Sequence, residues 1–154
     1  MTDMTETIIS GKLTKEQVNA FLEAPRMARL ATAVPAKDEP GQFQPHNVPV
    51  WFYWDGQSLF ISAFQSTRKA KEARRNPHIA VIIDVQDPED GMQAVLMEGR
   101  SEFITEPDVV QEMSRVIYTR YMGEEGVKAE APQSWIVDPE NAIIKLTPRK
   151  IFTW

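Results

Sequence analysis

The stretch 46–54 constrains the fold of this chain more than any other, because it is apolar on both faces of an extended strand. Its side chains alternate between one face (Val48, Val50, Phe52 and Trp54) and the other (Pro49, Trp51 and Tyr53). A strand that buries both faces needs a second cover besides the core of its own sheet. The pattern leaves open whether a ligand, a partner subunit or both supply that cover. Asp55 and Gly56, which follow directly, are a strong signal for a two-residue hairpin turn.

The remaining pattern predicts a mainly β fold. Apolar alternation and turn signals place further strands at residues 27–34, 59–64, 79–85, 93–104 and 142–154. Helical signals place helices after Thr14, between Thr67 and Asn76, and between Pro107 and Gly123, with a loop over residues 126–133. Hairpin-connected strands with few helices favour a closed or split barrel with flanking helices. We expect a flexible N-terminus over residues 1–12 and a single domain over residues 13–154.

Composition argues against several classes of function. The net charge of −5 at pH 7 argues against a nucleic-acid-binding protein, which usually carries a basic excess. Without cysteine the chain has no thiol nucleophile or thiolate metal site, and His46 and His78 lie in no metal-ligand spacing. The polar N-terminus is no signal peptide, and no apolar stretch approaches the roughly 20 residues of a membrane helix. We therefore expect a cytoplasmic protein without metal, nucleic-acid or membrane partners.

The strongest local signal for a binding site is the segment Ser66, Thr67, Arg68 and Lys69, where two hydroxyl groups precede two cations at a predicted helix start. A helix N-terminus attracts phosphate through its free N–H groups and its positive dipole end. Arg68 can hold two phosphate oxygens as a fork, and Lys69 adds a point charge. The same residues also fit a capped helix with a solvated basic face. Spacing alone leaves both interpretations open.

No side chain stands out as a catalyst. The serines fit no nucleophile elbow, and the acidic residues show no arrangement suited to acid–base work. The catalytic residues are therefore unassigned. If the protein is an enzyme, a cofactor supplies the difficult chemistry.

Several motifs, in this order and spacing, resemble the pyridoxamine-phosphate-oxidase-like, flavin-binding split-barrel proteins. They are Arg-Leu-Ala-Thr at 29–32, Pro-His-Asn-Val-Pro-Val-Trp-Phe at 45–52, Ser-Thr-Arg-Lys-Ala at 66–70, Arg-Asn-Pro at 75–77, and a glutamine at 93. The resemblance implies an antiparallel Greek-key split barrel that works as a homodimer with FMN at the subunit interface. It implies cofactor contacts from His46, Asn47, Val48, Pro49, Val50, Trp51, Ile61 and Ser62, phosphate contacts from Ser66, Thr67, Arg68 and Lys69, and a contact from Gln93 of the other subunit.

The chain also departs from part of this family. The vitamin-B6 oxidases have an arginine in place of His46 and a lysine in place of Trp51, so oxidation of pyridoxamine phosphate is not expected. The resemblance favours an FMN-dependent oxidoreductase that acts on an unidentified small molecule. One alternative is a reductase that uses the deazaflavin coenzyme F-420, whose longer anionic tail would meet Lys71, Arg74 and Arg75. Another is a non-catalytic protein that binds flavin or haem.

Overall fold

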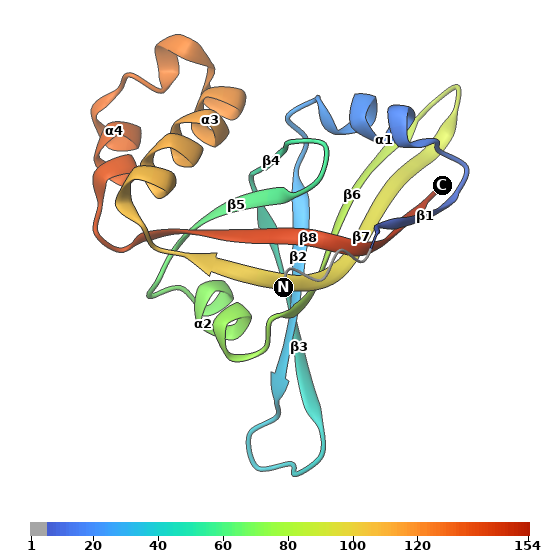
Figure 1. The fold of residues 1–154 in the computed structure, drawn as a ribbon, viewed down its shortest axis with the longest axis horizontal. Coiled ribbons are helices and arrows are strands. Elements are labelled where there is room, and N and C mark those ends of the chain that lie inside the picture. The colour runs from blue at the N-terminus through green and yellow to red at the C-terminus, as the bar shows by residue number, and fades with distance from the viewer. Residues whose placement is uncertain (1–5) are drawn as a thin grey trace.

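An eight-stranded sheet flanked by four helices makes up residues 6–154, the part of the chain that the computed structural model describes (Figure 1). The strands are β1 (Ile8–Gly11), β2 (Ala28–Pro35), β3 (Phe43–Val50), β4 (Phe52–Trp54), β5 (Leu59–Phe64), β6 (His78–Asp87), β7 (Gly91–Ile104) and β8 (Asn141–Thr153). The helices are α1 (Lys15–Leu22), α2 (Arg68–Arg75), α3 (Pro107–Gly126) and α4 (Glu130–Val137).

The sheet is a split barrel. Its strands follow the order β3-β2-β6-β7-β8-β5-β4, and each neighbouring pair is antiparallel. β1 adds to it by running parallel to the last residues of β8. The end strands β3 and β4 follow each other in the chain with only Trp51 between them, but among the described strands they do not pair. The barrel therefore stays open at Trp51, and the expected mainly antiparallel split barrel with flanking helices is confirmed.

Two apolar clusters hold this architecture together. The larger one fills the barrel and includes Leu30, Phe52 and Ile144, all of which are fully buried. The smaller one lies between the sheet and the α3–α4 pair and includes Ile117 and Ile143. Because side chains alternate along a strand, Ile143 and Ile144 of β8 serve different clusters. This arrangement explains why the start of β8 is apolar and buried on both faces.

The helix starts follow the local sequence signals. Thr14 caps α1 and forms a capping box with Gln17. Thr67 caps α2 by accepting a hydrogen bond from the N–H of Ala70. None of the helices in residues 6–154 is both long and apolar enough to cross a bilayer.

Three local predictions need correction. A strand, β1, lies within residues 8–11, ahead of Leu13 where the ordered chain was expected to begin; residues 1–5 of the predicted N-terminus lie outside the described residues. The predicted loop at 126–133 is wrong in part, because α4 begins at Glu130 and Pro132 fits its first turn. The predicted strand 46–54 is two strands, interrupted at Trp51 where the barrel splits.

Candidate functional site

A cavity of about 300 Å³ opens where β3 ends, beside β5 and the first turn of α2. Its lining residues are Met27, Pro49, Val50, Trp51, Ser62, Ala63, Phe64, Lys69 and Tyr118. The structure thus brings together five residues that the sequence resemblance named, from three separate segments. A volume of this size lies at the lower end of the roughly 300–1,000 Å³ that is usual for small-molecule sites. We call this space the ring cavity because its lining is largely apolar and includes the aromatic residues Trp51, Phe64 and Tyr118.

Lys69 is the charged group of the ring cavity. Its side chain is half-buried, and burial lowers the pKa of the ammonium group because leaving water disfavours the charged form. No residue in 6–154 gives Lys69 an ion pair or a side-chain hydrogen bond. A partly desolvated cation without a protein partner is a favourable place for an anionic ligand group.

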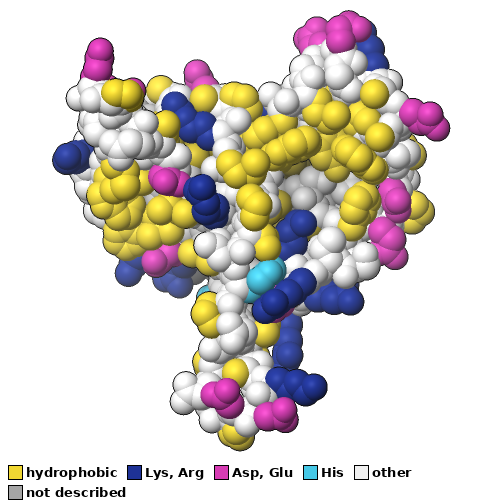
Figure 2. Space-filling model, turned by 180° about the vertical axis from the view of Figure 1, so that it is seen from behind, with side chains coloured by type: hydrophobic (Ala, Val, Ile, Leu, Met, Phe, Trp, Pro, Cys, Tyr) yellow, Lys and Arg dark blue, Asp and Glu magenta, His cyan; other side chains and the backbone are white. Residues whose placement is uncertain are grey.

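A second cavity of about 380 Å³, the basic cavity, is lined by Val34, Ser66, Arg68, Lys71, Glu72 and Arg75. Its cations Arg68, Lys71 and Arg75 follow the three- and four-residue spacing of one helix face. Arg74 lies differently, since its guanidinium carbon is 4.8 Å from the centre of the Phe103 ring. Figure 2 shows dark blue side chains beside a histidine on this face of the molecule, below a broad band of hydrophobic side chains.

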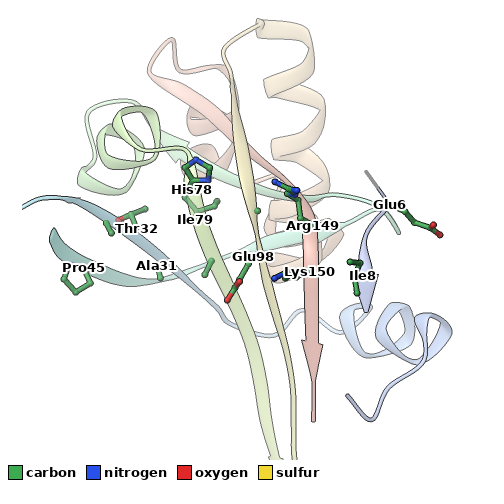
Figure 3. A pocket seen from close by; sticks show the side chains of 13 residues that line it. Glu6, Ile8, Ala31, Thr32, Pro45, His78, Ile79, Glu98, Arg149 and Lys150 are labelled. Carbon is green, nitrogen blue, oxygen red and sulfur yellow. The ribbon is translucent and has the colours of Figure 1, made fainter. Parts of the chain in front are cut away.

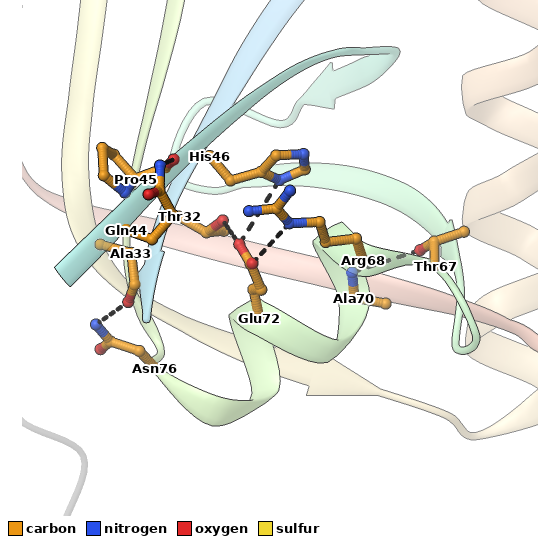
Figure 4. A network of polar contacts seen from close by, with 10 residues as sticks. All are labelled: Thr32, Ala33, Gln44, Pro45, His46, Thr67, Arg68, Ala70, Glu72 and Asn76. Carbon is orange, nitrogen blue, oxygen red and sulfur yellow. Dashed lines mark hydrogen bonds and ion pairs between the residues drawn. The ribbon is translucent and has the colours of Figure 1, made fainter. Parts of the chain in front are cut away.

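Glu72 is the buried anion beneath these cations (Figure 4). Thr32 donates a hydrogen bond of 2.6 Å to its Oε2, and Arg68 Nε donates one of 2.8 Å to its Oε1. The Nδ1 of His46 is 3.6 Å from Oε2, is buried, and has no hydrogen-bond partner in the described chain. Burial alone raises the pKa of Glu72, but the hydrogen bonds from Thr32 and Arg68 and the charges of Arg68 and His46 outweigh it. The pKa of Glu72 therefore lies below its ordinary value.

An aromatic and polar wall from α3 completes the ring cavity. The hydroxyl groups of Tyr118 and Ser62 are 2.8 Å apart, and Ser62 also donates to Asn141. Burial raises the pKa of Tyr118, although its side-chain hydrogen bonds with Ser62 and Ser114 partly offset the effect. Trp51 stacks on Tyr121, with 4.8 Å between ring centres and 4° between planes. These contacts fix the side chains around the cavity before any ligand arrives.

Some of the predicted site residues lie elsewhere. Ile61 is fully buried in the barrel core, and the Thr67 hydroxyl group is used in the helix cap and in a bond to the Phe64 carbonyl. Gln93 lies near the start of β7, where it pairs with Val85 of β6, and it does not line the ring cavity.

Sequence reasoning missed Glu72 and Tyr118. Glu72 had a signal, because an acidic residue four positions after Arg68 is an expected ion-pair partner on a helix. No sequence pattern pointed to Tyr118, since its contact with Ser62 joins residues 56 positions apart and depends on how α3 packs on the sheet.

A third and larger cavity, about 640 Å³, lies on the outer face of the sheet (Figure 3). We call it the outer groove. Small side chains form much of its floor, namely Ala31, Ala33 and Ala80, together with Gly99. Charged side chains stand around it, among them Glu98, Arg149 and Lys150. The outer groove shares no lining residue with the ring cavity or the basic cavity.

Comparison with known proteins gives the family. A conserved hypothetical protein of Mycobacterium tuberculosis is 21% identical, with 97% of this chain and 89% of that chain covered and a TM-score of 0.75. An F-420 reductase is 25% identical (86% and 94% covered, TM-score 0.65), and a FAD-binding protein of Mesorhizobium loti is 20% identical (90% and 92%, TM-score 0.63). No protein with a curated description matches. The family model described as pyridoxamine 5'-phosphate oxidase matches residues 14–154, and the chain therefore belongs to that family.

Proposed function

We propose that this protein binds FMN and works as a flavin-dependent oxidoreductase on a small molecule. The flavin ring occupies the ring cavity against Pro49 and Val50, and the phosphate lies at the start of α2. One observation carries the proposal: Lys69, a half-buried cation without a partner in residues 6–154, faces a largely apolar cavity, and Arg68, the preceding residue at the same helix start, keeps its terminal nitrogens free of hydrogen bonds within those residues.

The residues present suit such a cofactor. The first turn of α2 offers backbone N–H groups and a positive dipole end, and Arg68 and Lys69 neutralise a phosphate dianion. Trp51, held by its stacking on Tyr121, gives a rigid wall for a flat ring. When bound, the flavin supplies hydride or electron transfer. The chain's own residues hold its ring and phosphate and shape the space beside them.

We also propose that the protein forms a homodimer, with its partner covering the outer groove. Two observations support this. The floor of the groove is made of small residues, which let a second backbone approach closely, and the exposed part of β3 continues along it at Pro45. In addition, Gln93 does not line the ring cavity of its own chain, which fits the contact from the other subunit that the family resemblance implies.

Purification of the protein tests the proposal directly. We expect a yellow protein whose absorption spectrum and released ligand identify FMN, and a mass in solution of twice 17.6 kDa. Reduction of the bound flavin by a nicotinamide donor, followed by reoxidation by a quinone, separates an oxidoreductase from a protein that only stores flavin. A colourless monomer whose melting temperature does not respond to added FMN would refute the proposal.

The deazaflavin alternative has one observation in its favour. Lys71 and Arg75 line the same cavity as Arg68, so cations continue along α2 beyond the place of a single phosphate. From Arg68 to Arg75 the helix rises about 10 Å at 1.5 Å per residue. A cofactor with a longer anionic tail, such as coenzyme F-420, fits this row, and the F-420 reductase among the structural relatives supports the comparison.

The variants Arg75→Ala and Arg74→Ala separate the two cofactors. They remove the same charge from adjacent positions, but only Arg75 lines the basic cavity, while Arg74 packs on Phe103. For FMN we expect neither variant to change Kd by more than about twofold. For coenzyme F-420 we expect about a tenfold loss in Arg75→Ala and no loss in Arg74→Ala, as one charge-assisted contact is removed. Equal losses of affinity in both variants would show that the overall charge of α2 affects binding and that Arg75 does not mark a site for the anionic tail.

A further inference from the structure

Glu72 makes an unusual contact with Arg68, because it uses only one edge of the guanidinium group. Its Oε1 accepts from Nε at 2.8 Å, and within residues 6–154 neither terminal nitrogen of Arg68 has a hydrogen-bond partner (Figure 4). The Glu72 side chain is 10% exposed, whereas that of Arg68 is 55% exposed. The inner end of the guanidinium group is therefore anchored, and its two outer donors remain free in the basic cavity.

The anchor is itself tied to the sheet. Thr32 of β2 donates to the other oxygen of Glu72 at 2.6 Å, and this bond is buried. Thr32 is paired across the sheet with His46, whose Nδ1 is 3.6 Å from the same oxygen. Near the other end of α2, Asn76 donates to the carbonyl of Ala33 at 2.7 Å, so the helix cannot slide along β2. Arg68 is thus held in register with the barrel through Glu72.

The fold alone does not explain why a carboxylate lies at this place, because its charge and its burial are both unfavourable there. Its negative charge opposes an anion bound a few ångströms away, and its burial has to be offset by hydrogen bonds. The advantage lies in orientation, because a long arginine side chain otherwise loses rotamer entropy each time it binds. We propose that Glu72 is a positioning residue, which holds the two terminal nitrogens of Arg68 toward the phosphate of the ligand. The inference rests on the proposed function.

The test compares FMN with riboflavin, which has the ring but no phosphate, in the Glu72→Ala and Glu72→Gln variants of the full chain. We expect Glu72→Ala to weaken FMN binding about tenfold and to leave riboflavin binding unchanged. Glu72→Gln keeps an acceptor for Arg68 and a group that can bond Thr32, while it removes the opposing charge. That variant should therefore bind FMN at least as well as the unmodified protein.

A double-mutant cycle with Arg68→Ala gives the readout that a purely structural role would not produce. If Glu72 acts through Arg68, adding Glu72→Ala to Arg68→Ala changes the FMN affinity by less than about twofold. Independent, additive losses overturn the proposal, as do equal losses of FMN and riboflavin.

The ¹⁵N–¹H signal of Arg68 Nε separates this inference from the proposed function. We expect a slowly exchanging signal in the unmodified protein and in Glu72→Gln, and its loss in Glu72→Ala. If no variant binds flavin but the signal behaves in this way, Glu72 still orients the guanidinium group of Arg68 and the flavin function fails. If flavin binds and the signal is already absent in the unmodified protein, the positioning role is refuted and the flavin function survives.

Discussion

Replacing Arg68 and Lys69 together with alanine is expected to weaken FMN binding by about 3 kcal/mol, which is more than a hundredfold in Kd. Each cation gives the phosphate a charge-assisted hydrogen bond worth about 1.5–3 kcal/mol. The Arg68 side chain is 55% exposed, so water and salt screen its contact with the phosphate, and the lower end of that energy range applies to it. Lys69 is half-buried beside the ring cavity, and its contact is less screened.

Titration of flavin fluorescence with both FMN and riboflavin checks this prediction. Riboflavin affinity should change by less than about threefold, because the lost contacts are to the phosphate. The control is the double variant Arg115→Ala with Lys128→Ala, which removes two cations from an exposed part of α3 and the turn after it. An unchanged FMN affinity in the first variant, or the same loss in the control, would contradict the site.

The local parts of the fold were predictable because short-range signals decide them. The Thr14 and Thr67 caps and the turn at Gly56, which has a φ of 99°, each depend on a few neighbouring residues. The pairing of β7 with β8 also shifts register between Glu98 and Gly99. A Cβ at Gly99 would lie 2.9 Å from the carbonyl oxygen of Thr147, so the close approach of β7 and β8 requires glycine.

The parts that could not be predicted depend on contacts between distant residues. β1 pairs Ile8 with Lys150 at the other end of the chain, and a strand of four residues carries little signal of its own. α4 has no side-chain cap hydrogen bond at Ala129, and it is held by packing of Ile136 in the smaller apolar cluster. Without a cap or a clear period, only the tertiary partner decides that this segment is helical.

The candidate site also combines residues that a local pattern can reveal with residues that only the tertiary structure brings together. The residues at 49–51, Ser62 and Lys69 were named from a family resemblance, and their meeting in one cavity is a property of the barrel that no local pattern contains. Tyr118 reaches that cavity only because α3 packs over β5 and β8. The Glu72 carboxylate is different, since its four-residue spacing from Arg68 could have been recognised in the sequence.

Arg120 of α3 is the residue whose loss should destabilise the fold most among its surface cations. Its Nε donates to the carbonyl of Phe52 at 3.1 Å. Its terminal nitrogens donate to the carbonyls of Leu22, Glu23 and Ala24 at 3.1–3.4 Å. The last turn of α1 has no basic residue, so Arg120 satisfies carbonyl groups that the helix leaves unpaired. One side chain thus joins α1, β4 and α3.

We expect Arg120→Ala to lower the free energy of unfolding by about 3 kcal/mol, because partly buried carbonyls lose a charged donor and keep no replacement. For a chain of this length, such a loss lowers the melting temperature by about 6–12 °C. The free energy of unfolding of Arg120→Lys should lie between those of the unmodified protein and Arg120→Ala, since a single ammonium group cannot span carbonyls on two elements. Urea unfolding measures the effect, and Arg115→Ala on the exposed face of α3 should stay within about 0.5 kcal/mol of the unmodified protein. If Arg120→Ala were as stable as Arg115→Ala, α1 would be held by its apolar contacts at Val18, Phe21 and Leu22 without the arginine.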